Sequence, residues 1–216
     1  SVNMAAGGIY TFGGAFWEFG QPDWERTEYF MIFGVAEDHD SNPIKLGLSK
    51  LKSRGIKVVG VNPVRTGYNA IADEWVGITP GTDGLFILSL IHELLKKGHI
   101  DIDYLLRYTN AAWLVIDNPD GSDHGLFVRN RNGDPMVIER TSGKQASAHK
   151  KGVKPHLKGE VKLTRGRTAR PVFELLAEKY LADEYSAQAV SERTGVPAAV
   201  SAASSWAGRA SRAGRP

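Results

Sequence analysis

The chain has 216 residues, of which 42% are hydrophobic and 24% charged, with a formal net charge of +3. This length predicts one domain, or one domain plus appendages, and the small net charge does not favour a nucleic-acid partner. Cysteine is absent, which excludes disulfides, thiolate zinc sites and cysteine-ligated iron–sulfur clusters within these residues. No apolar run reaches the roughly 20 residues of a membrane helix.

The first residues carry no basic region typical of a secretory signal, and position 1 is not an initiator Met. We therefore expect the chain to begin inside a longer one and to be cytoplasmic. Residues 1–28 are rich in glycine and aromatic side chains. Glycines let backbone approach closely and aromatics fill the space around them, so this segment is expected to pack against a ligand or another part of the protein.

A strand, a helix and a second strand are predicted next. Residues 30–36 form a short apolar run, and residues 37–42 are polar. Pro43 suits the first turn of a helix that Gly55 ends, and residues 57–61 form the second apolar strand. This pattern of about 30 residues predicts a right-handed βαβ unit with parallel strands.

The following elements alternate between strand and helix. The predicted order is a strand at 75–79, a buried helix at 85–97, a helix at 101–108 and a strand at 113–116. Thr82 or Asp83 would cap the first of these helices. The fold class is therefore α/β, with a Rossmann-like parallel sheet flanked by helices.

Residues 117–170 are expected to form an insertion. Asn132-Gly133 lies between apolar runs at 125–128 and 136–139, which predicts a β-hairpin. Residues 142–170 are basic and are expected to be a loop, either a solvated one or an anion-binding surface. Helices are predicted at 171–181 and 187–194, and a disordered or foreign tail at 198–216.

Three polar loops follow predicted strands, and the carboxyl ends of parallel strands are where open sheets bind ligands. Asn62 to Thr66 offers an amide, a guanidinium and a hydroxyl for ribose and diphosphate oxygens, or it is simply a strand-ending turn. Thr82 and Asp83 cap a helix, bind an anion or do both. His39 and its acidic neighbours favour a solvated or capping role over a metal site, and His92 favours a core role.

The order of four motifs resembles the dimethyl-sulfoxide-reductase superfamily of molybdopterin oxidoreductases, which includes formate dehydrogenases and nitrate reductases. The resemblance covers about residues 1–200. The motifs are a glycine-rich run ending in Phe12-Gly13, a strand and loop from Phe33-Gly34 to Asn42-Pro43, Asn62-Pro63-Val64-Arg65-Thr66, and Ala72-Asp73 followed by Pro80 to Asp83. No Gly-x-Gly-x-x-Gly fingerprint follows a strand, which disfavours an ordinary NAD dehydrogenase.

The resemblance implies a molybdenum bis(molybdopterin guanine dinucleotide) cofactor whose guanosine end these loops would hold. The implied cofactor-binding residues are Gly34, Glu37, His39, Asn42, Asn62, Pro63, Val64, Arg65, Thr66, Gly81, Thr82 and Asp83. No metal ligand is assigned, because the family's molybdenum ligand falls at or before Ser1. A [4Fe-4S] cluster is expected in the missing N-terminal part of the parent.

The predicted organisation has five parts, namely residues 1–28 beside the cofactor, 29–116 Rossmann-like, 117–170 insertion, 171–197 helical and 198–216 tail. The parent is expected to perform two-electron redox on a small-molecule substrate, and its expected partners are its remaining domains and an electron-transfer subunit. The alternative is a non-catalytic nucleotide-binding module or a regulatory subunit. Cysteines and a barrel domain in the flanking gene would favour the enzyme.

Overall fold

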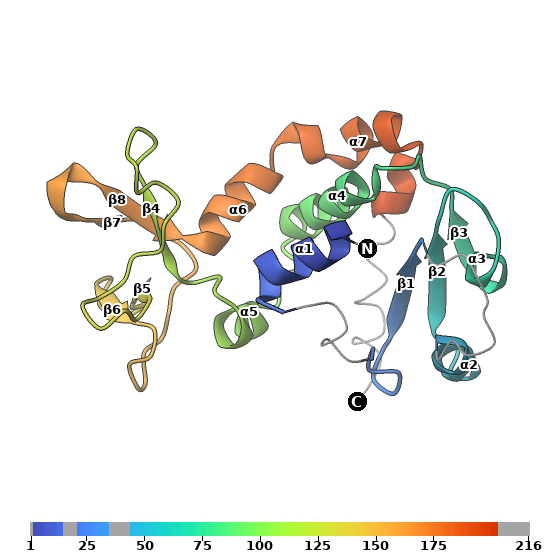
Figure 1. Ribbon diagram of the computed structural model, residues 1–216, viewed down its shortest axis with the longest axis horizontal. Coiled ribbons are helices and arrows are strands. Elements are labelled where there is room, and N and C mark those ends of the chain that lie inside the picture. Colours follow the sequence, from blue (N-terminus) through green and yellow to red (C-terminus); the bar gives the residue numbers. More distant parts are fainter. Residues whose placement is uncertain (1, 15–20, 35–43, 203–216) are drawn as a thin grey trace. The chain divides into compact units, whose positions relative to one another are not determined.

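The computed structural model describes residues 2–14, 21–34 and 44–202. The chain divides into two compact units at the junction between Pro80 and Gly81. The described part of the first unit holds α1 (Val2–Phe12), β1 (Tyr29–Phe33), α2 (Ile44–Ser53), β2 (Lys57–Val61), α3 (Tyr68–Ile71) and β3 (Glu74–Val76). The remaining elements belong to the second unit (Figure 1).

A parallel sheet in the order β1-β2-β3 forms the centre of the first unit. Val58, Val59 and Val61 of β2 are buried, as β-branched side chains favour in a central strand. Leu48 and Leu51 of α2 pack in one cluster with residues of β1, β2 and α3. The predicted parallel βαβ unit is confirmed, although β3 begins at Glu74 and ends at Val76 instead of running over 75–79.

Asp73 joins the start of β3 to neighbouring elements of this unit. Its Oδ1 accepts from Lys52 Nζ at 2.8 Å, and its Oδ2 accepts from the Val58 N–H at 2.8 Å. The Lys52 hydrogen bond first, and the Val58 N–H second, lower the pKa of Asp73 from its ordinary value. A carboxylate whose pKa falls on folding stabilises the folded state above its unfolded pKa, and the contribution is lost as the pH drops further.

In Asp73→Asn, the free energy of unfolding should therefore change less with pH than in the wild type. Because both side chains are partly exposed, we expect a loss below about 1 kcal/mol near neutral pH. The difference between the wild type and the variant should shrink as the pH falls below about 4. The test is the urea midpoint measured from neutral to acid pH, with Asp103→Asn on an exposed helix as control. A difference that grows towards acid pH would contradict the assigned sign.

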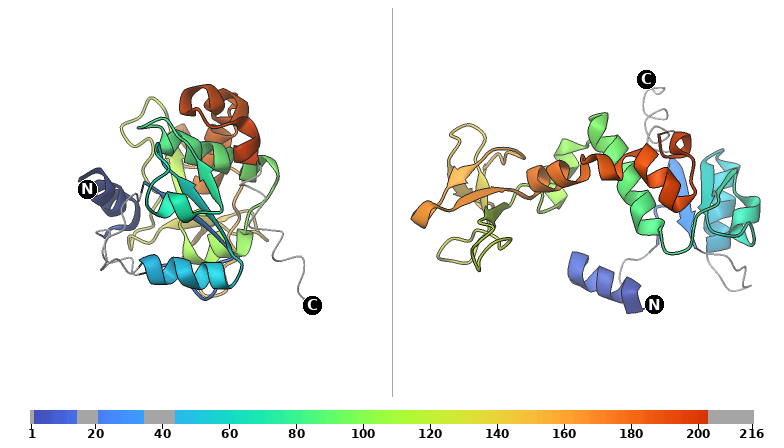
Figure 2. Two further views of the ribbon diagram at one scale, coloured as in Figure 1. Left: turned by 90° about the vertical axis from the view of Figure 1, so that its right-hand side faces the viewer. Right: turned by 90° about the horizontal axis from the view of Figure 1, so that it is seen from above.

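Four of the described helices form one part of the second unit (Figure 2). They are α4 (Asp83–Lys96), α5 (Ile102–Tyr108), α6 (Val172–Tyr180) and α7 (Ala187–Thr194). The predicted helix at 187–194 is confirmed as α7, and Gly195 ends it in the left-handed conformation. The Nδ1–H of His92 donates to the carbonyl of Tyr180 at 2.9 Å, so this histidine is a satisfied core residue. Most leucines of α4 are only half-buried, and its buried stripe includes Ser89, His92 and Glu93.

Residues 198–202 are helical, and the expectation of disorder from residue 198 is wrong for them. Ser201 is buried, and its Oγ lies 3.2 Å from the Oγ of Ser89 on α4. Lys97 Nζ also donates to the carbonyl of Ala202 at 3.1 Å. Small alanine and serine side chains carry no apolar period, but they allow close packing on α4. The rest of the predicted tail, 203–216, lies outside the described residues.

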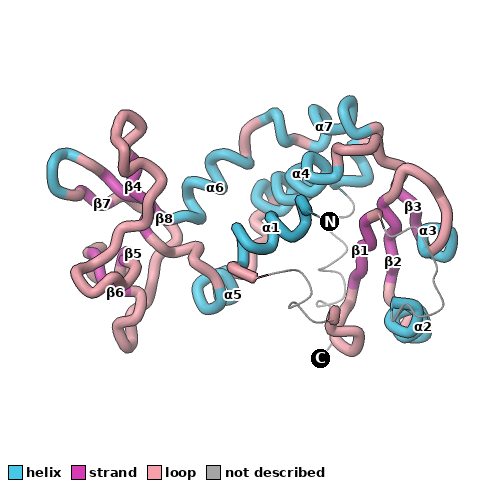
Figure 3. Tube along the Cα trace, viewed as in Figure 1, coloured by secondary structure: helices cyan, strands magenta, loops and turns pink. Residues whose placement is uncertain are grey.

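Short antiparallel strands form the remainder of the second unit, with long loops between them (Figure 3). They are β4 (Leu114–Asp117), β5 (Met136–Ile138), β6 (Gln145–Ser147), β7 (Val161–Lys162) and β8 (Thr168–Pro171). The described strands pair as a β4-β8-β7 sheet and a β5-β6 hairpin. The hairpin expected around Asn132-Gly133 is present but narrow, with one bridge between Arg129 and Pro135 and a hydrogen bond from the Met136 N–H to the Val128 carbonyl at 2.9 Å.

The expectation that residues 142–170 form a loop is also wrong in part, because β6, β7 and much of β8 lie there. One of the pairings is distant, since β8 pairs with β4 about fifty residues earlier, whereas β6 and β7 pair with the neighbouring strands β5 and β8. Val161 and Ala169 are buried between polar and charged neighbours, and they hold β7 and β8 in place. The strands in this region contain only a few apolar residues among many lysines, so the alternating pattern that predicts a strand was not recognised.

Candidate functional site

Two of the predicted loops begin at the carboxyl edge of the parallel sheet in the first unit. The Gly34 N–H donates to the Val61 carbonyl at 3.0 Å, and the Asn62 N–H donates to the Val76 carbonyl at 3.1 Å. Gly34 turns away from β1 with φ of +67°, a conformation that favours glycine. The ends of β1, β2 and β3 therefore lie side by side, as the sequence predicted for a parallel sheet.

Asn62 holds the loop that follows β2. Its side chain is buried, and Nδ2 donates to the Val64 carbonyl at 2.9 Å. Its own carbonyl accepts from Trp75 Nε1 on β3 at 3.0 Å. In contrast, Pro63, Val64, Arg65 and Thr66 are all exposed. The amide of Asn62 thus fixes the loop internally, and the exposed residues after it are the ones available to a ligand.

Asn69 holds the other end of the same loop. Its backbone N–H donates to the Thr66 carbonyl at 3.1 Å, and its side-chain Nδ2 approaches the same carbonyl at 3.4 Å. The Asn69 side chain is fully buried over β2, where it occupies the space beside Gly60. A Cβ on Gly60 would come within 2.3 Å of Asn69 Oδ1. Gly60 is therefore required for Asn69 to reach the loop.

Sequence reasoning missed Asn69 and Trp75 as positioning residues. The local pattern identifies Trp75 only as the start of a strand, and it does not single out Asn69. A glycine inside a predicted strand was the available signal, because such a glycine often marks a close approach of another group. The group that approaches Gly60 belongs to a different element, so local pattern cannot identify it.

The remaining predicted residues lie in other parts of the chain. Glu37, His39 and Asn42 lie outside the described residues. Gly81 to Asp83 begin the second unit, where Thr82 occupies the N-cap of α4 as expected. The Thr82 side chain makes no capping hydrogen bond, and Asp83 is the first residue of the helix. A carboxylate at this end of a helix is favoured by the helix dipole.

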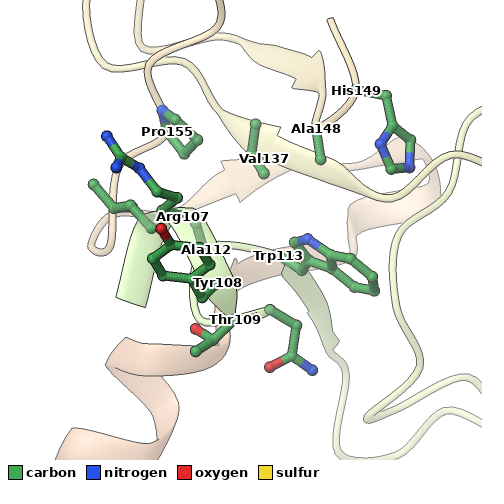
Figure 4. Close-up of a pocket in the computed structure, with 11 residues that line it drawn as sticks. Arg107, Tyr108, Thr109, Ala112, Trp113, Val137, Ala148, His149 and Pro155 are labelled. Atoms are coloured by element: carbon green, nitrogen blue, oxygen red, sulfur yellow. The ribbon is translucent and has the colours of Figure 1, made fainter. Parts of the chain in front are cut away.

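Two further observations bear on ligands. Among the described residues, no group of three or more histidine, cysteine or acidic side chains could hold a metal ion. A cavity of about 560 Å³ lies in the second unit, beside α5 and β5. Figure 4 shows side chains from α5, the segment before β4, β5 and the segment after β6 around this hollow, among them Tyr108, Trp113 and His149. None of the predicted cofactor-binding residues that the structure describes lines it.

The fold is α/β, and its polar loops lie at the carboxyl edge of a parallel sheet, which is the edge where open sheets of this kind bind ligands. The chain is 49% identical, over 92% of its length, to a sulfite dehydrogenase subunit of Allochromatium vinosum. It is 26% identical, over 82% of its length, to the alpha subunit of perchlorate reductase from Dechloromonas aromatica. It spans 21% and 23% of the length of these two relatives. No family model matches it.

A solved structure, acetylene hydratase from Pelobacter acetylenicus, shares the fold. The TM-score is 0.56 with 17% identity, over 94% of this chain and 19% of that one. The relatives are members of the molybdopterin DMSO reductase superfamily. This chain belongs to that family, of which it represents one part, and the resemblance found in its motifs is confirmed. Its relatives are molybdenum-dependent oxidoreductases.

Proposed function

We propose that the full-length protein carrying this chain is a molybdenum-dependent oxidoreductase, and that this chain holds the guanosine end of a bis(molybdopterin guanine dinucleotide) cofactor. The observation that supports it most directly is the exposed loop from Pro63 to Thr66 at the carboxyl edge of a parallel sheet. Two buried asparagines fix that loop before any ligand arrives. The 49% identity to a sulfite dehydrogenase subunit supports the redox activity.

Each predicted segment contributes by its own chemistry. The Arg65 guanidinium would bind diphosphate oxygens, and Thr66 would offer a hydroxyl to ribose. Asn62 would act through its bonds to the loop. Gly81 to Asp83 would receive the guanine edge, because a carboxylate can accept two hydrogen bonds from it. Gly34, with Glu37, His39 and Asn42 beyond it, would line the same arm of the cofactor.

The cofactor, when bound, supplies the two-electron redox chemistry, and the protein positions and tunes it. The proposal includes a small-molecule substrate, a [4Fe-4S] cluster elsewhere in the parent, and association with an electron-transfer subunit. Both relatives are named as single subunits of larger enzymes, which supports multi-subunit assembly. None of the described helices is long and apolar enough to cross a membrane. A cytoplasmic location stays a prediction.

The alternative is a non-catalytic nucleotide-binding module or regulatory subunit. It is not favoured, because the relatives are redox enzymes and the match to the sulfite dehydrogenase subunit covers 92% of this chain. Molybdenum analysis of the purified full-length protein separates the two. The proposal expects molybdenum and a guanosine nucleotide released on denaturation. A folded full-length protein that contains neither would contradict it.

Nucleotide binding tests the residue assignment. We expect GDP to bind the cofactor-free full-length protein, with Asp83→Ala and Arg65→Ala each weakening binding by about 1–3 kcal/mol, the scale of a lost hydrogen bond to a charged group. Calorimetry measures the affinity. Asp103→Ala, which removes an exposed carboxylate on α5, is the matched control and should leave the affinity unchanged. Equal affinities for Asp83→Ala and Asp103→Ala would show that Asp83 has been assigned wrongly.

A further inference from the structure

The cavity beside α5 combines aromatic walls with positive charge. Its lining includes Arg107, Tyr108, Trp113 and His149, and no acidic residue of the described chain lines it. Tyr108 is 66% exposed, and the Arg107 guanidinium carbon lies 5.9 Å from the centre of its ring. Tryptophan, tyrosine and arginine are the side chains that most often anchor protein–protein contacts.

The chain around this cavity carries a large excess of cations. Residues 117–170 hold twelve Lys and Arg against six Asp and Glu, although the whole chain is only +3. Lys150 and Lys151 follow the cavity residue His149 directly, Lys154 precedes the cavity residue Pro155, and all three lysines are exposed. Their side chains form no ion pair within the described ranges of the chain. The Arg140 N–H donates to the Lys154 carbonyl at 2.8 Å, which places a further exposed cation beside them.

The acids of this region are mostly engaged and do not neutralise these lysines. Asp117 accepts from Arg170 at 3.1 Å, and Asp123 pairs with Arg167. Asp134 accepts from Asn130 at 2.9 Å. The backbone N–H groups of Thr141 and Ser142 bind the Glu139 carboxylate and lower its pKa to about 2. The three exposed lysines therefore keep their charge, and the insertion as a whole keeps its excess of cations over acids.

We propose that this cavity, with its rim of Arg107, Lys150, Lys151 and Lys154, is a docking surface for a carboxylate-rich segment of an accompanying subunit. An aromatic or aliphatic side chain of that segment enters the cavity, and the carboxylates beside it meet the rim. The inference rests on the proposed function in one respect, namely that the parent assembles with another subunit. Charge complementarity then governs the rate and the salt sensitivity of assembly.

The first test uses the full-length protein and a labelled peptide of alternating glutamate and leucine, with binding followed by fluorescence anisotropy. Lys150→Glu combined with Lys154→Glu should weaken binding by about tenfold or more, because two attractions become repulsions. Lys96→Glu combined with Arg193→Glu makes the same change in net charge on exposed helical positions and should alter it by less than about twofold. Tyr108→Ala should also weaken binding.

Controls separate the proposal from its competitors. A glutamine–leucine peptide should bind poorly, and a thymidine oligonucleotide that bound more tightly than the glutamate peptide would overturn the proposal in favour of nucleic acid. Equal losses in both charge-reversed pairs would also overturn it. GDP affinity should be unchanged in the Lys150→Glu, Lys154→Glu variant, so a failure of docking leaves the nucleotide assignment standing.

Lysine acylation of the assembled enzyme identifies the source of the occupant. Lys150, Lys151 and Lys154 should react slowly in the complex and quickly once salt removes the accompanying subunit, while Lys96 reacts alike in both. If the three lysines react equally in both states, nothing docks there. If they are protected in the isolated full-length protein, the parent's own domains cover the surface. Either result overturns the proposal.

Discussion

Gly60→Ala should speed local opening of the first unit by about tenfold to a hundredfold, equivalent to about 1–3 kcal/mol of overpacking in a well-packed core. The added Cβ would lie 2.3 Å from Asn69 Oδ1 and 3.1 Å from the Asn69 Cα. Asn69 is fully buried and cannot swing into solvent, so its backbone must move. The loop from Pro63 to Thr66 would lose its anchor, and GDP affinity should fall as well.

Hydrogen exchange followed by mass spectrometry measures this effect. Peptides that span β2 and α3 should exchange faster, because exchange reports local opening. Gly84→Ala is the matched control, since a Cβ at Gly84 meets nothing within 4 Å and the position is helical. That variant should stabilise α4 by about 0.5–1 kcal/mol. Unchanged exchange in Gly60→Ala would show that Asn69 relaxes freely and does not fix the loop.

Phe86→Ala should destabilise the helical part of the second unit by about 3–5 kcal/mol, the range for removing a buried phenylalanine. Phe86 is the largest fully buried side chain among the described residues, and it lies on α4. Its carbonyl accepts from the Ser89 hydroxyl, which in turn lies 3.2 Å from Ser201 Oγ. The cavity left by the ring would therefore loosen the contact between α4 and residues 198–202.

Hydrogen exchange of peptides that span α4 and α7 measures this loss of stability. Their exchange rate should rise more than about a hundredfold, which corresponds to about 3 kcal/mol. Ile87→Ala is the control, because Ile87 is the next residue on the same helix but is 41% exposed. It should cost less than about 1 kcal/mol. Equal effects of the two substitutions would contradict the assignment of α4's buried stripe.

Local sequence pattern was sufficient to predict the parallel βαβ unit and the family to which the chain belongs. The valines of β2, the leucines of α2 and the turn residues around them act over a few positions, so the sequence predicted β1, α2 and β2 in order. Gly195 ends α7 for the same local reason. The motif from Asn62 to Thr66 was placed correctly at the carboxyl edge of the sheet, because the carboxyl ends of parallel strands all lie at the same edge.

Tertiary structure decided what depends on distant partners. Short strands such as β6 and β7 contain too few residues to show a period. The sheet that contains β7 also depends on the pairing of β8 with β4, which is far away in the sequence. The polar stripe of α4 is buried only because Ser201 and Tyr180 supply hydrogen-bond partners. The sequence by itself determined the family and the loop, whereas packing determined that Asn69, seated over Gly60, holds that loop in place.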